Sequence, residues 1–248
     1  MRSTTSAPTP GANDVSEELL GELCEWLNGP DFTAPTEDWR VPYEIIKAAL
    51  AHLYLAWVHP FGDGNGRTAR LLEFRILLAA GVPSPATHLL SNHYNQTRSE
   101  YYRQLARTSE SGGDVMPFIV YAVQGFLDGL REQLKTIRQQ QFDDRWEQFV
   151  YETFGEARSP AARRQRQLVL DLSKRGIRDE PVPRPKLRTL SPALAEAYAG
   201  KTAKTLSRDI NELVRMHLIE RSKGGFRARR DRVLAFLPLS AAEGVDVV

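Results

Sequence analysis

The sequence contains a single cysteine, Cys24, among its 248 residues. One cysteine excludes an intramolecular disulfide framework and argues against a cysteine-based zinc site, and both absences are typical of proteins in a reducing compartment. Because Cys24 lies in the amphipathic run Leu19–Leu27, we expect it to be a small residue that faces the core.

Long hydrophobic runs are missing as well. No stretch approaches the roughly 18 apolar residues that span a bilayer, and residues 1–14 lack the apolar centre of a secretory signal. We therefore predict a flexible lead-in over residues 1–14 and a cytoplasmic protein that does not bind membranes. Since 42% of the residues are hydrophobic, the chain can form a buried core.

The net charge of +2 conceals an asymmetry along the chain. Residues 1–157 carry 13 Lys and Arg against 21 Asp and Glu, whereas residues 158–232 carry 20 against 8. This change of sign predicts two domains, one over residues 15–157 and one over residues 158–240. The second is suited to a polyanionic partner.

Helical spacing of apolar residues dominates the first domain, and strand signals before residue 215 are few. The predicted helices cover residues 15–28, 42–58, 66–80, 92–110 and about 115–155. Ser16 or Asp14 is the expected N-cap of the first helix. Pro60 should end the second helix at His59, because a residue before proline disfavours the α conformation. The run Leu71–Ala80 is apolar on nearly all sides, which indicates a buried central helix.

The second domain has shorter elements. Helices are predicted over residues 161–175, 192–199 and 202–217, and two β-like runs around Gly224-Gly225 indicate a hairpin. Three helices and a hairpin are the outline of a winged helix-turn-helix. The predicted fold class is therefore mainly α, with a helical domain followed by a small winged-helix domain that has a β-hairpin wing.

Basic and apolar residues of the last predicted helix lie on nearly opposite faces. The basic residues of the helix and hairpin are Lys201, Lys204, Arg208, Arg215, Lys223, Arg227, Arg229 and Arg230. Such a face predicts that residues 201–232 bind duplex DNA through phosphates and base edges. The alternative is a solvated basic helix in a module for protein docking or homodimer formation.

Candidate chemistry is concentrated in one segment, His59-Pro-Phe-Gly-Asp-Gly-Asn-Gly-Arg-Thr-Ala-Arg70. The glycines at 62, 64 and 66 let the backbone turn its N–H groups inward, and the helix that follows adds its positive dipole end. A phosphate group fits such a site. Each residue taken singly has an ordinary structural role, such as pairing of Arg70 with Glu73 or burial of Phe61. The combination indicates phosphoryl or nucleotidyl transfer.

The side chains of this segment complete the prediction. Asp63 supplies a carboxylate that can hold Mg²⁺ bridging phosphates. Arg67 and Arg70 are three residues apart on the first helical turn, where two guanidiniums can clamp phosphate oxygens. His59 is the group whose ordinary pKa suits a general base near neutral pH.

The segment resembles the motif of the Fic (Fido) family, His-Pro-Phe-x-Asp/Glu-Gly-Asn-Gly-Arg-x-x-Arg, at every specified position. The resemblance extends from about residue 17 to about residue 130. It includes Thr97–Leu105, which is similar to the family's Arg-x-x-Tyr-Tyr helix. It implies a protein adenylyltransferase that moves AMP from ATP to a Ser, Thr or Tyr hydroxyl of a target protein and releases pyrophosphate.

The resemblance also implies roles for single residues. His59 would deprotonate the target hydroxyl, Asp63 would hold Mg²⁺, and Tyr102 would line the adenine pocket. The amides of the loop would cradle the α-phosphate, and Arg70 would take the γ-phosphate. The residues expected to bind ATP are Gly62, Gly64, Asn65, Gly66, Arg67, Arg70 and Tyr102.

The chain departs from the family pattern in three places. Ser109 stands where some relatives have an asparagine that contacts adenine. No Ser/Thr-x-x-x-Glu-Gly/Asn inhibitory sequence precedes the motif, and only residues 1–19 precede the stretch that normally follows a target-docking flap. These departures predict an N-terminally truncated chain or another mode of regulation.

Other activities remain open. Gly66 argues against the phosphorylating branch, whose motif contains a lysine, whereas removal of AMP or transfer of phosphocholine uses a similar motif. The remaining alternative is a DNA-binding regulator whose Fic-like domain is a sensor or is inactive.

Overall fold

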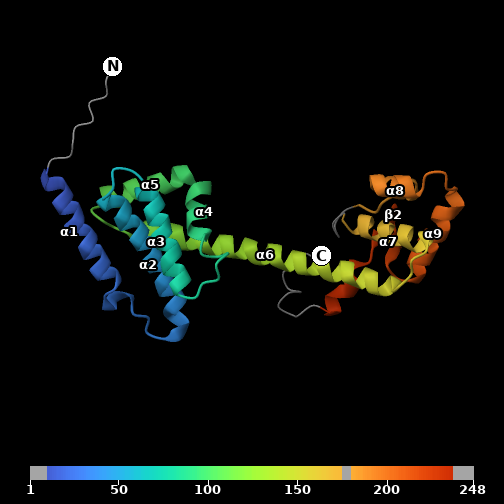
Figure 1. The fold of residues 1–248 in the computed structure, drawn as a ribbon, viewed down its shortest axis with the longest axis horizontal. Coiled ribbons are helices and arrows are strands. Elements are labelled where there is room, and N and C mark those ends of the chain that lie inside the picture. Colours follow the sequence, from blue (N-terminus) through green and yellow to red (C-terminus); the bar gives the residue numbers. More distant parts are fainter. Residues whose placement is uncertain (1–9, 175–179, 237–248) are drawn as a thin grey trace, which may run out of the picture. The chain divides into compact units, whose positions relative to one another are not determined.

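The computed structural model describes residues 10–174 and 180–236 (Figure 1). The protein is mainly α-helical, as predicted, and its Cα packing divides it into two compact units, Met1–Glu132 and Gln133–Val248. Within the described ranges, every helix is too short or too polar to cross a membrane. Most of the predicted lead-in lies outside the described residues.

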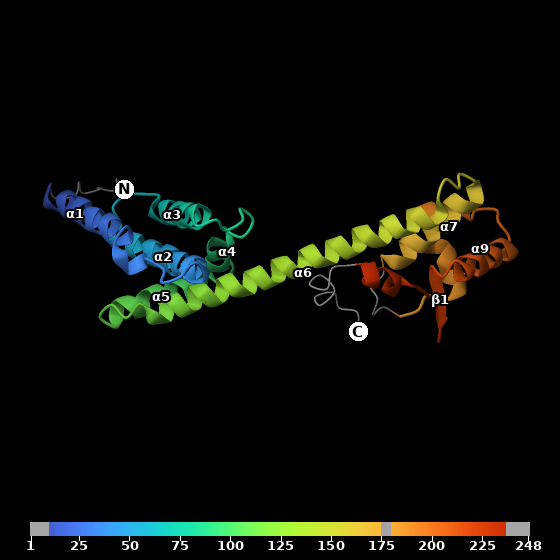
Figure 2. The same cartoon turned by 90° about the horizontal axis from the view of Figure 1, so that it is seen from below.

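The first unit is built from helices that the sequence largely predicted. They are α1 (Pro10–Leu27), the 3-10 turn η1 (Pro30–Phe32), α2 (Glu37–Val58), α3 (Asn65–Ala79), α4 (Leu89–Gln96), α5 (Arg98–Glu110) and the first part of α6 (Met116–Phe154). Both views show α1, α2 and α3 side by side (Figures 1 and 2). The two helices that flank the candidate loop, α2 and α3, therefore pack directly against each other.

Helix boundaries differ from the prediction at three places. The first helix begins at Pro10, so Asp14 and Ser16 lie inside it and neither is its N-cap. The second begins at Glu37 and tolerates Pro42 in its second turn. The predicted helix over residues 92–110 is two helices that meet at Thr97. Helical periodicity locates the interior of a helix better than its ends, because end residues make few periodic contacts.

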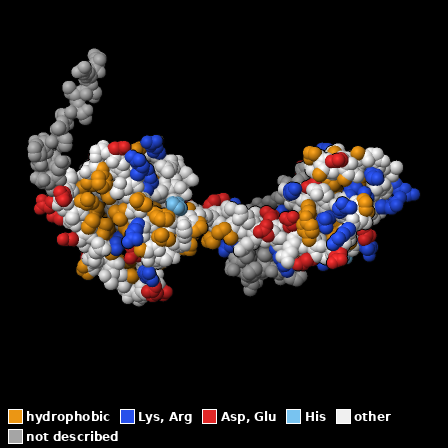
Figure 3. Space-filling view, in the orientation of Figure 1, with side chains coloured by type: hydrophobic (Ala, Val, Ile, Leu, Met, Phe, Trp, Pro, Cys, Tyr) orange, Lys and Arg blue, Asp and Glu red, His pale blue; other side chains and the backbone are white. Residues whose placement is uncertain are grey.

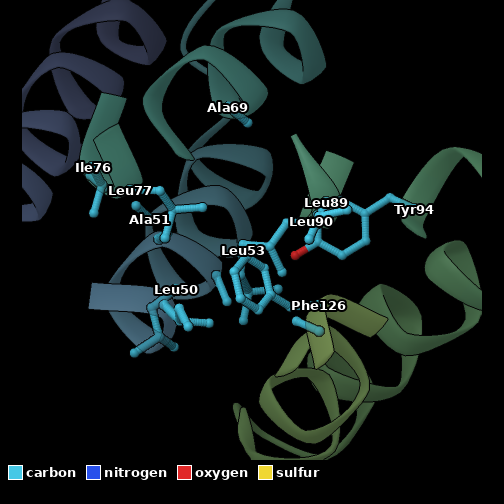
Figure 4. Packing of buried hydrophobic residues seen from close by; sticks show 14 of the residues in the cluster. Leu50, Ala51, Leu53, Ala69, Ile76, Leu77, Leu89, Leu90, Tyr94 and Phe126 are labelled. Atoms are coloured by element: carbon cyan, nitrogen blue, oxygen red, sulfur yellow. The ribbon is translucent and has the colours of Figure 1, made fainter. Parts of the chain in front are cut away.

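The core of the first unit joins α2, α3, α4 and α6. Leu53, Leu77 and Leu90 are completely buried, and Figure 4 shows Leu53 close to Phe126 of α6. The stop of α3 is as predicted, since Gly81 has φ +87° and its N–H donates to the carbonyl of Leu78. This left-handed glycine satisfies carbonyls that the helix end leaves free.

Three predictions of burial were wrong. Leu71 is 66% exposed and Leu78 is 47% exposed, so α3 buries one face, not its whole circumference. Cys24 is exposed, because α1 packs through Leu23 and leaves the next position at the edge of the apolar face. Phe61 is 42% exposed and does not plug the core. Hydrophobic type alone did not indicate which face of each element meets its neighbour.

The second unit contains the end of α6 and a series of short elements. They are α7 (Pro160–Ser173), the 3-10 turn η2 (Arg184–Thr189), α8 (Pro192–Ala197), α9 (Ala203–Arg215), β1 (Ile219–Ser222), β2 (Gly225–Ala228) and the 3-10 helix η3 (Arg230–Phe236). The two strands form the predicted hairpin, with Ile219 opposite Ala228. Phe142 and Trp146 of α6 are buried in the same cluster as Leu168 of α7.

The predicted boundary between residues 157 and 158 lies in the turn that separates α6 from α7, inside the second unit. Ser159 caps α7, since its side chain accepts a hydrogen bond from the Ala162 N–H. The division between compact units falls earlier, at Glu132–Gln133 within α6. A domain boundary at residue 157 stays a prediction.

A buried carboxylate connects α9 to α7. Asp209 is 3% exposed and accepts two hydrogen bonds from Arg164, at 2.7 Å and 3.2 Å. It also accepts hydrogen bonds from Gln165 Nε2 and from the Tyr198 hydroxyl, both at 2.9 Å. Burial and the charge of Asp209 raise the pKa of Tyr198, which keeps its hydroxyl a donor. All four groups lie in one polar network within an apolar core.

The sequence did not predict a backbone bridge between Val182 and the hairpin. Val182 exchanges two backbone hydrogen bonds with Phe226, each at 3.0 Å. A Cβ atom on Gly225 would overlap the Val182 carbonyl oxygen. We therefore expect Gly225→Ala to destabilise the second unit by about 1–3 kcal/mol, because the backbone must move to relieve the overlap.

Thermal unfolding followed by circular dichroism and by limited proteolysis of the second unit measures this effect. Gly21→Ala is the matched control, since a Cβ there meets nothing within 4 Å. It should stabilise α1 slightly, because alanine favours a helix interior over glycine. Equal stability of Gly225→Ala and the unmodified protein would contradict the prediction.

Candidate active site

A short loop between α2 and α3 holds the candidate site. The second helix ends at Val58, and His59 follows it with φ 48° and ψ 53°, in the left-handed region. The prediction that Pro60 ends this helix is confirmed, but His59 adopts a left-handed conformation. Gly64 has φ +90° and directly precedes Asn65, the first residue of α3. The loop thus turns sharply at both ends.

Asn65 holds the loop closed. Its Oδ1 accepts a hydrogen bond from the Phe61 N–H at 2.9 Å, and its Nδ2 donates to the Phe61 carbonyl at 2.5 Å. The side chain is 5% exposed, in contrast to the exposed residues around it. We predicted Asn65 as a contributor of a backbone amide, and the sequence gave no sign that its side chain clamps the loop.

The side-chain amide of Asn65 also determines which ring nitrogen of His59 carries the proton. Asn65 Nδ2 lies 3.1 Å from His59 Nε2. Because Asn65 Oδ1 is already directed at the Phe61 N–H, the amide nitrogen faces the ring, and an amide nitrogen can only donate. His59 Nε2 is therefore the acceptor, and the proton of the neutral ring is on Nδ1. The electron pair on Nε2 is basic, and this exposed imidazole can accept a proton there once a substrate hydroxyl displaces the Asn65 amide.

Asp63 and Arg67 pair with each other beside Gly64. Asp63 Oδ1 accepts the Gly64 N–H at 2.6 Å, and Oδ2 accepts Arg67 Nη2 at 2.9 Å. Both side chains are largely exposed. An exposed ion pair of this kind contributes about 0–1 kcal/mol, so it can open at low cost when a stronger ligand arrives.

The carboxylate of Asp63 fits a shared magnesium site. Mg²⁺ prefers oxygen ligands and is usually bound by one or two carboxylates together with substrate phosphates. Across residues 10–174 and 180–236, no three His, Cys, Asp or Glu side chains gather into a metal site. A single carboxylate such as that of Asp63 could hold Mg²⁺ together with phosphate oxygens.

The two predicted arginines both lie over the start of α3. A Cβ on Gly64 would lie 3.5 Å from Arg67 Nη2, and a Cβ on Gly66 would lie 3.5 Å from Arg70 Nη1. The pairing of Arg70 with Glu73, considered above, does not occur, because Glu73 is buried beside His52. The first intrahelical bond runs from the Thr68 N–H to the Gly64 carbonyl. The amides of Asn65, Gly66 and Arg67 are thus free to bind an anion, whereas the Gly64 N–H donates to Asp63.

Gly62 and Tyr102 complete the set of predicted site residues. Gly62 is exposed at the turn of the loop, with open space where a side chain would be. Tyr102, in α5, is 54% exposed and lies under the guanidinium of Arg98, 5.8 Å from it. Its ring centroid is 5.2 Å from that of Tyr101, which is half-buried. Tyr102 thus presents an aromatic surface at the edge of the unit.

A buried polar network that the sequence analysis missed connects α2, α3 and α5. His52 Nδ1 lies 3.3 Å from Glu73 Oε1, and His52 Nε2 lies 2.9 Å from the Tyr101 hydroxyl. Burial and the charge of Glu73 raise the pKa of Tyr101 to about 12, while the positive charge of Arg70 acts in the opposite direction. A glutamate inside an otherwise apolar helix was the signal that could have revealed this network.

Comparisons with known proteins find sequence similarity over the segment that contains this loop. A model of the Fic/DOC family matches residues 3–77, which include the whole loop. Protein adenylyltransferase fic-1 of Caenorhabditis briggsae is 38% identical over 116 residues, covering 47% of this chain and 20% of the relative. The protein of the same name from Caenorhabditis elegans is 39% identical with the same coverage.

A third relative is similar over about the same share of the chain. Protein adenylyltransferase Fic of Nematostella vectensis is 35% identical over 115 residues, covering 46% of this chain and 23% of the relative. The chain thus spans about a fifth of the length of the curated relatives that it matches. The similarity concerns a Fic segment and not the whole of those proteins.

Proposed function

We propose that this chain transfers AMP from ATP to a hydroxyl side chain of a protein target. One observation carries the proposal: the unprotonated Nε2 of His59 lies in the same loop as the helix amides and two guanidiniums at the start of α3. The similarity to curated protein adenylyltransferases supports the same reaction.

The phosphates of ATP bind at the start of α3 in this proposal. The amides of Gly64, Asn65 and Gly66 cradle the α-phosphate, and Arg67 exchanges Asp63 for phosphate oxygens. Arg70, which extends over Gly66, takes the γ-phosphate. Mg²⁺ held by Asp63 neutralises phosphate charge when it is bound. The exposed ring of Tyr102 lines the adenine site.

The chemical step then needs one proton acceptor. The target hydroxyl displaces the Asn65 amide from His59 Nε2, which takes the hydroxyl proton as that oxygen bonds to the α-phosphorus. The bond between the α-phosphorus and the bridging oxygen breaks, and pyrophosphate leaves with the bonding electrons. The product carries a phosphodiester between AMP and the side chain, and His59 retains the proton until solvent removes it. Charge neutralisation by amides and arginines supplies most of the acceleration.

Asn65 positions both the loop and the base in this mechanism. We expect Asn65→Ala to lower kcat by about 10- to 100-fold, because the Phe61 backbone and the His59 ring both lose their partner. Transfer of labelled AMP at saturating ATP measures the loss. Asn211→Ala, an exposed asparagine of α9, serves as the control and should leave the rate unchanged. A kcat unaffected by Asn65→Ala would contradict this role.

Two isotopic positions in ATP test the proposed reaction. The full chain is incubated with Mg²⁺, cell lysate and ATP labelled at the α- or the γ-phosphate. Transfer of AMP labels protein from the α-position alone, whereas phosphorylation labels it from the γ-position. Label that appears from neither position, or that is removed from previously labelled protein, would overturn the proposal in favour of an inactive domain or of AMP removal.

A second candidate function is binding of duplex DNA by the second unit, as a winged helix. We infer this architecture from the order α7, Val182 bridge, α8, α9 and hairpin. Lys204 and Arg208 are exposed on α9, while Leu206 and Ile210 on its other face are buried. That division supports a helix whose basic face meets phosphates.

The hairpin is a weaker basic wing than the sequence predicted. Arg230 is buried, where it donates to the Ser173 carbonyl and pairs with Asp143. Arg229 pairs with Asp231 and Glu220. These two guanidiniums are neutralised by carboxylates and stabilise the unit.

Salt dependence distinguishes specific phosphate contacts from diffuse attraction. If α9 binds DNA, Lys204→Ala with Arg208→Ala should lower the affinity for a duplex and reduce the salt slope by about 2, since each lost phosphate contact changes the slope by about 1. The paired exposed Arg215 provides the control, Arg215→Ala. An unchanged slope would remove this candidate. Homodimer formation and the cytoplasmic location stay predictions.

A further inference from the structure

A cavity of about 530 Å³ lies at the corner between the end of α6 and the start of α7. Its lining residues are Gly155, Glu156, Ala157, Arg158, Arg163 and Arg166. All six belong to the second unit, and none belongs to the loop from His59 to Arg70 or to α9. Three of the six lining residues are arginines, and one, Glu156, is acidic.

Local structure brings the three arginines together. Gly155 has φ +52°, so the chain turns as soon as α6 ends. Arg158 lies in the connecting turn, just before the capping residue Ser159. Arg163 and Arg166 are three residues apart on α7, which places them on one face of that helix.

Neutral groups, and not carboxylates, hold two of these side chains. Arg163 Nε donates to the Arg158 carbonyl at 3.2 Å. The Arg166 guanidinium lies 4.6 Å from the ring centroid of Tyr151. A carbonyl and an aromatic face restrict a guanidinium without neutralising its charge. Both side chains are therefore partly pre-positioned while remaining cationic.

Arg164, which lies between Arg163 and Arg166 in the sequence, has a structural role instead. Arg164 turns into the core, where Asp209 neutralises it in a bidentate pair. By contrast, no ion pair with a carboxylate is recorded for Arg158, Arg163 or Arg166 in the described part of the chain, although Glu156 lines the same cavity. Within the four residues from Arg163 to Arg166, α7 thus contains one structural arginine and two that line the cavity.

We infer that this cavity binds a phosphate-bearing anion with at least two negative charges. Three guanidiniums and one carboxylate leave a local charge of about +2, which complements such an anion, and guanidinium forks match phosphate oxygens. Arg166 already covers one face of Tyr151, so the recognition is of phosphate and not of a stacked base. Free polyphosphates and the backbone of duplex DNA share this chemistry.

Titration of the full chain with tripolyphosphate and with a duplex of about 20 base pairs tests the inference. All proteins carry Arg67→Ala and Arg70→Ala, so that the loop of the candidate active site contributes little binding. The test variant adds Arg158→Gln, Arg163→Gln and Arg166→Gln. The matched control adds Lys135→Gln, Arg138→Gln and Lys186→Gln, which remove the same charge elsewhere in the second unit.

The test variant should lose at least about tenfold in affinity for one of the two probes, and the control should change by less than about twofold. Preference for tripolyphosphate would identify a free anion as the ligand, and preference for the duplex would identify the backbone. Equal affinity of test and control variants, or no binding by the parent, would overturn the inference. Should the triple variant fail to fold, Arg163→Glu alone provides the same comparison at an exposed position.

Discussion

Replacing His59 with alanine is expected to lower the rate of AMP transfer by about 10²- to 10⁴-fold, which is the usual contribution of a general base. His59 Nε2 is the unprotonated nitrogen of the ring, and Asn65 fixes the ring through a hydrogen bond to it. Binding of ATP should change little, since the amides and arginines that meet the phosphates stay in place. A single-turnover assay with labelled ATP separates the two effects.

His217→Ala is a closely matched control for this substitution. His217 is also exposed, also follows the end of a helix, and also has a positive φ, 56°. Any loss that comes only from removing an exposed left-handed histidine should appear in both variants. If His59→Ala and His217→Ala transferred AMP at the same rate, His59 would not be the base.

Removing the carboxylate of Asp209 is expected to destabilise the second unit by about 3–5 kcal/mol, because Asp209→Ala leaves the charge of Arg164 buried without a partner. The Arg164 side chain is 10% exposed, so water cannot replace the lost oxygens. Gln165 and Tyr198 lose an acceptor in the same change. Denaturant unfolding monitored in the second unit measures the effect.

Two further variants show whether the buried charge is the cause. Glu212→Ala breaks the exposed pair with Arg215 and should change stability by no more than about 1 kcal/mol. Combining Arg164→Met with Asp209→Leu removes both charges and should recover part of the loss, since apolar pairs of similar volume often replace buried ion pairs. A double variant less stable than Asp209→Ala would contradict this explanation.

Most of the helices were predictable from the sequence because their apolar residues recur with helical spacing. The stop at Gly81, the cap at Ser159 and the hairpin around Gly224 have local causes that a short sequence displays. Helix starts were less predictable. The predicted helix starts at Pro42, whereas α2 begins at Glu37. The turns around Pro42 are exposed, so water can satisfy the carbonyl that lacks a donor because of the missing proline N–H.

The candidate site was likewise predictable only in part. The loop glycines and the arginine spacing indicated an anion site at the start of α3, and the structure brings both guanidiniums over it. The clamp by the Asn65 side chain and the network of His52, Glu73 and Tyr101 were not predicted. Both depend on contacts between residues whose rotamers a pattern does not specify.

The sequence by itself determined that this protein is mainly helical and that its positive charge is concentrated after residue 157, and it predicted an anion site between His59 and Arg70. These properties depend on residue type and on spacing within one or two helical turns. Only the tertiary structure decided which charges stay available. Arg164 and Arg230 meet carboxylates from other segments, whereas Arg163 and Arg166 meet neutral groups. Whether a charge is neutralised depends on residues that folding brings near, and spacing along the chain does not encode that proximity.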